Sequence, residues 1–424
     1  MGSRLGSALF RRYVVGIIAL AGPAGLVASV SSCAGCVFPW WKTEPETSTV
    51  RVANKPCIDV DGFNECVDPV SISVGWGHAC AITALEGVVC WGKNDRRQLG
   101  NGTNSSFSSP SLVWGLDSGV VAITAGWDHT CAITSDGGVV CWGDNSSGQL
   151  GDGAAPRRNS PTQVVGLTSG VIEISAGQSH TCALTSAGRV MCWGNNFYGE
   201  LGDGTLIRRT VPTPVAGLGA DIVSISAGNQ HTCALTSAGK VLCWGRNHYG
   251  EIGDGTTELR SVPTPVTGLA LDTEGTARIV AISCGWAHTC VQTSAHVVQC
   301  WGHNFYGQLG DGSTENRAEP TLVRGLDSDV VALSSGAQYA CVLTSEGAML
   351  CWGRNQYGKS ADTTTDTRLV PTVVRGFKSG VTTISARGNY ACAVTASQTA
   401  TCWGPNHDVA IGHGVKDNLL VPKR

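Results

Sequence analysis

The chain has few charged residues and a small net charge. Asp, Glu, Lys and Arg make up 14% of its 424 residues, whereas apolar residues make up 42%. Disordered chains show the opposite balance, so this composition predicts a folded protein. The formal net charge of −3 lacks the basic excess of nucleic-acid-binding proteins, so nucleic acid is not an expected partner.

The sequence also lacks a recognisable set of catalytic residues. No Ser/His/Asp combination, phosphate-binding loop or pair of catalytic carboxylates stands out from it. We therefore predict no catalytic residue, no cofactor and no metal site. An enzyme of the lyase or hydrolase class is an alternative, and it would need acidic or histidine side chains gathered at one place.

Glycine, cysteine and tryptophan are abundant by contrast, with 56, 19 and 13 residues. Nineteen cysteines are too many for a protein kept in reducing cytosol, unless they bind metal. The cysteine count therefore favours an oxidising compartment.

Residues 1–32 have the layout of an export signal. Three arginines and no acidic residue accompany an apolar run from Val14 to Val30, and small residues follow. The tetrapeptide Val-Ser-Ser-Cys that ends at Cys33 resembles the bacterial lipobox, whose cysteine receives a lipid. We predict a lipoprotein signal peptide over residues 1–32, with lipidation at Cys33. An uncleaved membrane anchor is one alternative, and a twin-arginine signal is another.

This signal predicts an exported protein of the bacterial cell envelope, either secreted or lipid-anchored in the outer membrane. The lipid anchor would be its only membrane contact. Removal of residues 1–32 leaves 26 basic and 32 acidic residues, a net charge of −6.

Residues 33–69 show no periodicity and are rich in Ser, Thr, Pro and Glu, which predicts a tether. Near its end, Cys57 and Cys66 are predicted to close a small disulfide loop. Asp59, Asp61, Asn64 and Glu65 between them could offer oxygen ligands, which leaves a short calcium-binding loop as an alternative.

From Val70 to the end of the chain, residues 70–424, one unit recurs seven times. Its Cys-Trp-Gly tripeptide returns every 51 residues, with one interval of 57 that contains an insertion near residues 271–278. A fixed period near 50 residues is typical of a propeller or solenoid. Within the copy from Val120 to Gly153, short alternating runs separated by glycine-rich turns predict strands.

Each copy holds two cysteines ten residues apart, as in Cys131 and Cys141. Direct pairing of these two leaves a three-residue hairpin loop, whose last residue, Gly137, needs a positive φ. Directly opposed Cα atoms lie about 4.5–5.5 Å apart, within the range of a disulfide. No copy adds cysteines at zinc-binding spacing. The predicted disulfides are Cys80–Cys90, Cys131–Cys141, Cys182–Cys192, Cys233–Cys243, Cys290–Cys300, Cys341–Cys351 and Cys392–Cys402.

Cys36 and Cys284 remain after these assignments. They form either a long-range bridge or two free thiols, and the sequence leaves both possibilities open.

The repeat reads Ile-Ser-Ala-Gly-x-x-His-Thr-Cys-Ala-Leu-Thr-Ser-Ala-Gly, then Cys-Trp-Gly-x-Asn-x-Tyr-Gly-Glu-Leu-Gly-Asp-Gly-Thr. It resembles the repeat of the regulator of chromosome condensation family. The resemblance implies an all-β, seven-bladed β-propeller with four-stranded blades, here with one disulfide per blade. Copies six and seven depart from the pattern at residues 359–362 and at 387–388 and 410–413, which predicts altered loops. Residues 419–422 are expected to pair near the first blade and close the ring.

The family's eukaryotic founder exchanges guanine nucleotide on a nuclear small GTPase, so nucleotide exchange is an alternative function. It needs a cytoplasmic address, which the export signal contradicts. A closer analogy is a secreted bacterial propeller that inhibits β-lactamases through a protein-binding face. We predict a non-catalytic, envelope-anchored monomer that binds a protein or glycan partner through its loop face.

Two recurring residue types are predicted to be structural. The histidines of the Gly-x-x-His segments would lie about 8–10 Å apart on neighbouring blades, too far to share a metal whose bonds are about 2.0–2.1 Å long. The aspartates of the Gly-Asp-Gly segments fit tight turns. The residues concerned are His78, His129, His180, His231 and His288, and Asp152, Asp203, Asp254 and Asp311.

The two residues between glycine and histidine vary from copy to copy while their neighbours repeat. Tryptophan there has little packing reason to exist, and it is a preferred anchor at interfaces. Plain loop packing is the alternative. The candidate binding residues, expected on equivalent loops of one face, are Trp76, Trp127, Asp128, Gln178, Asn229, Trp286 and Asn389.

Overall fold

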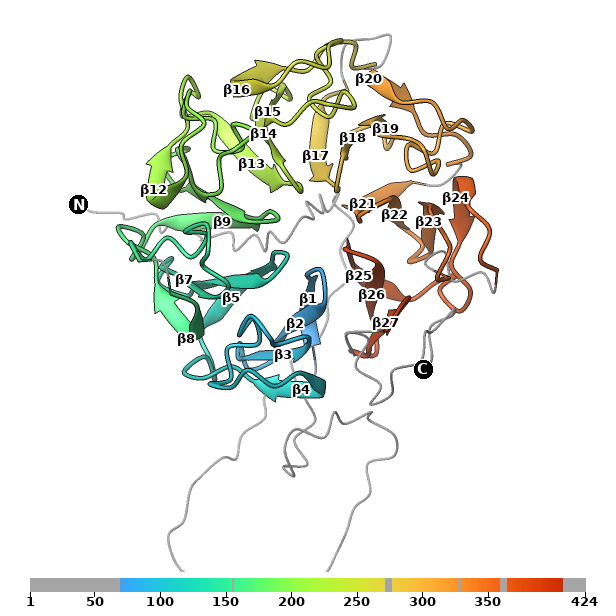
Figure 1. Cartoon of the computed structure of the whole chain (residues 1–424). Coiled ribbons are helices and arrows are strands. Elements are labelled where there is room, and N and C mark those ends of the chain that lie inside the picture. The colour runs from blue at the N-terminus through green and yellow to red at the C-terminus, as the bar shows by residue number, and fades with distance from the viewer. Residues whose placement is uncertain (1–68, 155, 271–276, 327–328, 359–363, 407–424) are drawn as a thin grey trace, which may run out of the picture.

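The computed structural model describes residues 69–154, 156–270, 277–326, 329–358 and 364–406. These residues form seven antiparallel sheets arranged around a central axis (Figure 1). Six sheets have four strands and one has three. The predicted seven-bladed, all-β propeller is therefore confirmed. No helix long and apolar enough to cross a membrane occurs among the described residues.

Each blade begins at the axis and proceeds outward, so that its strands neighbour one another in chain order. In Figure 1 the first strand of each blade lies near the axis, and the fourth lies at the rim. The strands are β1 (Pro69–Val74), β2 (His78–Thr83), β3 (Val88–Gly92) and β4 (Phe107–Leu112); β5 (Val120–Ala125), β6 (His129–Thr134), β7 (Val139–Gly143) and β8 (Arg158–Gln163); β9 (Val171–Ala176), β10 (His180–Thr185), β11 (Val190–Gly194) and β12 (Arg209–Pro214); β13 (Ile222–Ala227), β14 (His231–Thr236), β15 (Val241–Gly245) and β16 (Arg260–Pro265); β17 (Ile279–Cys284), β18 (His288–Thr293), β19 (Val298–Gly302) and β20 (Arg317–Leu322); β21 (Val330–Ser335), β22 (Tyr339–Thr344), β23 (Met349–Gly353) and β24 (Arg368–Val373); and β25 (Val381–Arg387), β26 (Tyr390–Thr395) and β27 (Ala400–Trp403).

The hairpin between the second and third strands has the predicted register in all seven blades. Cys131 lies directly opposite Cys141, and the seven predicted disulfides all form, with Cα atoms 4.0–4.1 Å apart. The last loop residue has a positive φ whether or not it is glycine: 76° at Gly137, 62° at Glu86 and 63° at His296.

Hydroxyl groups on the innermost strands join each blade to the next. In every blade a backbone N–H near the end of the first strand donates to a hydroxyl oxygen of the preceding blade, over 2.8–3.1 Å. The donor–acceptor pairs are Ala125–Ser73, Ala176–Thr124, Ala227–Ser175, Cys284–Ser226, Ser335–Ser283, Ala386–Ser334 and Val74–Ser385. The last pair links blade seven to blade one, so the hydrogen-bonded ring is closed.

The recurring histidines form a second connection between blades, as predicted for structural residues. At four junctions the histidine Nε2 lies 2.8–3.0 Å from a threonine Oγ1 of the next blade. Tyr339 and Tyr390 replace histidine at two other junctions and donate their hydroxyls to backbone carbonyls of the next blade. At the junction of blades five and six, Ala340 stands at the threonine position, and both ring nitrogens of His288 lack a hydrogen-bond partner among the described residues.

The tryptophans of Cys-Trp-Gly are buried between blades. Five of them donate Nε1–H to a loop carbonyl of the preceding blade over 2.8–3.0 Å, which explains why the tripeptide recurs. The five are Trp142, Trp193, Trp244, Trp301 and Trp352.

Several predictions made from the sequence lie outside the described residues. These are the signal peptide over 1–32, lipidation of Cys33, the tether, the Cys57–Cys66 loop, the altered loops at 359–362 and 410–413, and ring closure by residues 419–422. Cys284 is buried and has no disulfide partner among the described residues.

Candidate functional site

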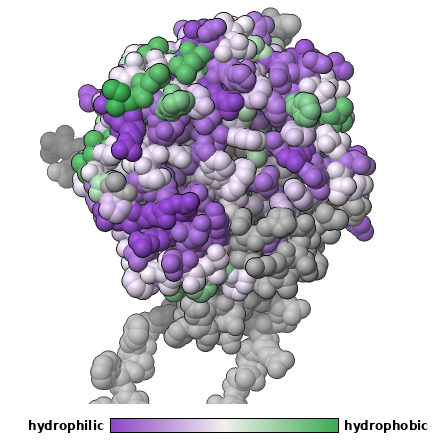
Figure 2. All heavy atoms as spheres, viewed as in Figure 1, coloured by the Kyte–Doolittle hydropathy of each residue, from purple (hydrophilic) through white to green (hydrophobic). Residues whose placement is uncertain are grey.

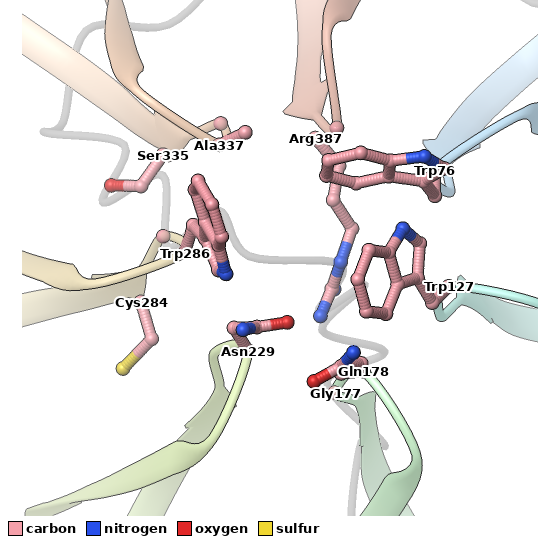
Figure 3. Close-up of a pocket in the computed structure, with 13 residues that line it drawn as sticks. Trp76, Trp127, Gly177, Gln178, Asn229, Cys284, Trp286, Ser335, Ala337 and Arg387 are labelled. Atoms are coloured by element: carbon pink, nitrogen blue, oxygen red, sulfur yellow. The ribbon is translucent and has the colours of Figure 1, made fainter. Parts of the chain in front are cut away.

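The first variable residue of each Gly-x-x-His loop reaches the same end of the central axis. All seven of these positions line one pocket at the mouth of the channel (Figure 3). They are Trp76, Trp127, Gln178, Asn229, Trp286, Ala337 and Gly388. The pocket opens to solvent, and the space between its lining atoms amounts to about 340 Å³ when the open solvent at its mouth is included. The channel beneath it is lined by all seven innermost strands.

Backbone geometry holds these loops in place. Glycine is required before the variable pair, because a Cβ on Gly126 would lie 2.3 Å from His129 Cε1 and 2.8 Å from the carbonyl oxygen of Gly177. Backbone hydrogen bonds then link neighbouring loops, from Gln178 N to Asn229 O over 3.3 Å and from Trp286 N to Gly336 O over 3.2 Å. These backbone contacts therefore preorganise the rim of the pocket.

Three tryptophans from blades one, two and five meet in this pocket. The rings of Trp76 and Trp127 lie edge to face with centroids 4.6 Å apart, and those of Trp76 and Trp286 lie edge to face at 6.5 Å. Such pairs are favourable beyond the area that they bury. The buried indole nitrogens of Trp127 and Trp286 have no hydrogen-bond partner among the described residues. In Figure 3 the nitrogen of Trp286 faces the interior of the pocket, near Asn229.

Arg387 extends into the centre of the pocket, where Figure 3 shows its guanidinium between Trp127 and Trp286. Its Nη2 donates to the carbonyl oxygen of Ala227, on the opposite side of the ring, over 3.0 Å. No carboxylate of the described residues lies within 4.0 Å of it. Burial lowers the pKa of Arg387 to about 10, so the guanidinium remains charged at neutral pH.

Two of the candidate residues do not line the pocket. Asp128 instead lies 3.5 Å from the Lys93 ammonium and accepts a hydrogen bond from Gln98 over 3.2 Å. Burial raises the pKa of Asp128. Asn389, the second variable residue of blade seven, is also absent from the lining. The pocket thus uses the first position of each variable pair.

Among the lining residues with a polar or reactive side chain, the sequence interpretation missed Arg387, Cys284 and Ser335. Arg387 carried a detectable signal, because it replaces the glycine that precedes the variable pair in the other six copies. Cys284 and Ser335 occupy a position that is alanine in copies two, three, four and seven, and nothing in their residue type indicates a pocket.

The repeated aspartates lie in turns, as predicted. Asp203 accepts hydrogen bonds from the backbone N–H and the hydroxyl of Thr205, and it pairs with Arg209 over 2.7 Å. Asp254 repeats this arrangement with Thr256 and Arg260. The oxygens of these carboxylates are therefore already bonded to residues of their own turns.

One group of potential metal ligands occurs among the described residues: His231, Cys233 and Cys284 have ligand atoms within 4.8 Å of one another. Cys233 is bound to Cys243 in a disulfide, so only two of the three side chains are available. Burial raises the pKa of the Cys284 thiol to about 12 and lowers that of His231 to about 3. The thiol is therefore protonated at neutral pH, and thiolate is the form that binds metal.

Of the described residues that line the channel, one carries a buried carboxyl group, Glu173 on β9. It accepts hydrogen bonds from the Ser224 hydroxyl over 3.1 Å and from the Ile225 N–H over 3.2 Å. Burial nevertheless raises its pKa to about 8.

Family models match much of the chain. The RCC1-like domain matches residues 43–294, and the regulator of chromosome condensation (RCC1) repeat matches residues 298–343 and 330–359.

Two relatives illustrate the range of proteins that share this repeat. The ultraviolet-B receptor UVR8 of Arabidopsis thaliana is 31% identical over 356 residues, which cover 82% of this chain and 80% of UVR8. The E3 ubiquitin-protein ligase HERC2 of Homo sapiens is 30% identical over 378 residues, which cover 86% of this chain but 8% of HERC2.

Solved structures agree in fold. Yeast RCC1 (Prp20) bound to Kap60 superposes with a TM-score of 0.70 at 21% identity, covering 80% of this chain and 83% of that chain. Human WBSCR16 gives a TM-score of 0.68 at 22% identity, covering 77% of this chain and 87% of that chain. The repeat motifs, the seven blades and these matches lead to one conclusion: the chain belongs to the regulator of chromosome condensation (RCC1) repeat family.

Proposed function

We propose that this chain is a non-catalytic, envelope-anchored propeller that holds a protein partner at the mouth of its channel. The observation that carries this proposal is the convergence of Trp76, Trp127 and Trp286 from three separate blades on one pocket. Tryptophan is enriched among the residues that dominate binding energy at interfaces. The described pocket lining includes neither a carboxylate nor an imidazole, which supports binding over hydrolysis or elimination.

Relatives that bind proteins favour a protein partner over a glycan. Yeast Prp20 is known in complex with Kap60, and it binds Gsp1p and histones. The acidic composition of this chain and the export signal predicted over residues 1–32 argue against nuclear partners and against nucleotide exchange on a GTPase.

Affinity capture from envelope extract, with the full-length chain as bait, tests this function. The double substitution Trp76→Ala and Trp127→Ala removes two anchors, and loss of even about 2 kcal/mol lowers affinity about thirtyfold. Trp114→Ala is the matched control, because Trp114 is 61% exposed and follows the outermost strand β4. Equal capture by the double variant and the control would rule out this site.

The anchor is a separate part of the proposal and has its own test. Cys33 would carry the lipid, so labelling with radioactive palmitate should mark the wild-type chain and leave Cys33→Ala unlabelled. Equal labelling of both chains would contradict the lipobox assignment.

Absorption of ultraviolet-B light is a second candidate function. It is favoured by the tryptophan cluster together with the 31% identity to an ultraviolet-B receptor. Light absorbed by the cluster should change the oligomeric state or the circular dichroism of the wild-type chain, and Trp76→Phe with Trp127→Phe should abolish the change. An identical response of the two chains to illumination would exclude the cluster as the absorbing site.

A further inference from the structure

We propose that the pocket formed by Trp76, Trp127, Trp286 and Arg387 binds a carboxylate attached to a flat or apolar group. This inference rests on the proposed function and names the chemistry of what the pocket receives. The carboxylate could belong to a free organic acid or to the acidic side chain or C-terminus of a protein partner.

The first argument is charge. Arg387 is a half-buried cation that no carboxylate approaches within 4.0 Å in the described part of the chain. Holding a charge away from water without a partner is costly, and such groups are normally paired. Glu173, the buried acid of the channel, already accepts hydrogen bonds from the Ser224 hydroxyl and the Ile225 N–H. An anion bound from solution would give the Arg387 guanidinium a partner of opposite charge.

The second argument is the supply of hydrogen-bond donors. A guanidinium has five N–H donors in a planar fork, and the structure gives Arg387 one acceptor, the carbonyl of Ala227. The buried Nε1–H of Trp286 faces the pocket and has no acceptor among the described residues. Planar donors of this kind match the two oxygens of a carboxylate.

The third argument is the shape of the walls. Trp76 and Trp127 present ring surfaces next to the guanidinium (Figure 3). A carboxylate alone would leave these walls uncovered, so the group that carries it should be flat or apolar.

Titration of the full-length chain with benzoate, followed by tryptophan fluorescence and calorimetry at neutral pH, tests the proposal. Benzoate should bind, and neutral benzamide should bind at least about tenfold more weakly, because it cannot form a charge-paired hydrogen bond with the guanidinium. A peptide that ends in Phe with a free carboxylate, compared with its C-terminal amide, distinguishes a protein source from a free acid.

Variants of Arg387 and Trp286 test which side chains donate hydrogen bonds to the carboxylate. Arg387→Gln should weaken benzoate binding about tenfold or more, and Arg387→Lys, which keeps the charge, should lose less. Trp286→Phe keeps the ring and removes the N–H, so it should weaken benzoate more than benzamide. Trp114→Phe is the control, and thermal unfolding confirms that each variant folds. Equal binding of benzoate and benzamide, or full benzoate binding by folded Arg387→Gln, would overturn the proposal.

The two proposals can fail independently. If Trp76 and Trp127 are required for partner capture but benzoate does not bind, the carboxylate inference is wrong and the binding face remains. If benzoate binds through Arg387 but substitution of Trp76 and Trp127 leaves partner capture unchanged, the assignment of protein binding to this pocket is wrong and the anion site remains.

Discussion

Arg387 occupies a position that is glycine in the six other repeats. In those repeats a Cβ would collide with the histidine or tyrosine ring that follows, as at Gly126 and Gly336. Blade seven avoids the collision because β25 is one residue longer than the other first strands, and Gly388 then takes a φ of 50°. Moving the glycine by one residue allows a cation to stand over the channel.

Glu173 makes stability depend on pH near neutrality. Its pKa is about 8 in the folded protein and about 4.3 in an unfolded chain. Between these values the folded state holds the extra proton, so the free energy of unfolding should fall by about 1.4 kcal/mol per pH unit as pH rises towards 8. Glu173→Gln keeps both hydrogen-bonding positions and should remove this slope. Urea unfolding between about pH 6.5 and 8 measures it, and identical slopes for both chains would contradict the assignment.

At the scale of the strand pair, each disulfide closes a hairpin of a single blade. Replacing Cys182 and Cys192 together with alanine should lower the free energy of unfolding by about 3 kcal/mol, because the unfolded chain loses its constraint. Cys284→Ala is the control: it removes a thiol without a disulfide partner among the described residues, at a position that is alanine in four other copies. Denaturant unfolding under oxidising conditions compares the two. Equal losses would mean that the bridges contribute nothing beyond packing.

The junction between blades five and six is imperfect in a way that suggests a stabilising substitution. Ala340→Thr would give His288 the hydroxyl that His129 and His180 find in the next blade. We expect a gain of about 1 kcal/mol from this hydrogen bond, measured as a higher melting temperature.

The matched control is Ala391→Thr. Its junction already holds the larger Tyr339 in place of histidine, so the added atoms should overpack it and lower stability by about 1–3 kcal/mol. If Ala340→Thr also destabilises the protein, the threonine positions are set by space and not by the histidine hydrogen bond.

The elements were largely predictable from sequence because the repeat fixes spacing. Ten residues between Cys131 and Cys141 determine the hairpin register, and that register determines the disulfides and the positive φ at Gly137. Bonds between blades were not predictable in the same way. The histidine position suggested a structural role, but its partner is a threonine 52 residues away in the chain, and only the three-dimensional ring brings the two together.

The same limit applies to the candidate site. The variable positions identified Trp76, Trp127 and Trp286 because tryptophan has little packing reason to occur in those loops and is a preferred anchor at interfaces. Asp128 looked equally variable, yet its side chain lies by Lys93 and outside the pocket lining. Which of two adjacent loop residues points to the axis depends on backbone geometry, which residue type does not reveal.

At the scale of the whole molecule, the ring of hydrogen bonds between the innermost strands is closed, since Val74 of blade one donates to Ser385 of blade seven. The surface in view is mainly hydrophilic, with hydrophobic residues in separate small patches towards its edge (Figure 2).

The ring should also lose stability steeply in acid. Burial lowers the pKa of His78, His129, His180, His231 and His288 to about 3, whereas each titrates near 6.5 when unfolded. The stability that they contribute is present above pH 6.5 and is lost as pH falls towards 3. Unfolding should take up as many as five protons in this window, each lowering the free energy of unfolding by about 1.4 kcal/mol per pH unit.

Acid titration followed by circular dichroism measures this cooperativity. His180→Gln should unfold with a shallower pH dependence that corresponds to one proton fewer. An acid transition of unchanged steepness would contradict the assignment of proton uptake to the buried histidines.

The central claim is that the channel mouth is where this propeller binds its partner. Site-specific photo-crosslinking in the producing cells tests it most directly, with the photoreactive residue placed either at Gln178 in the pocket or at the 68% exposed Phe197 outside its lining. We predict a partner adduct from position 178, lost in Trp76→Ala with Trp127→Ala, and none from position 197. Adducts from position 197 alone would contradict the claim.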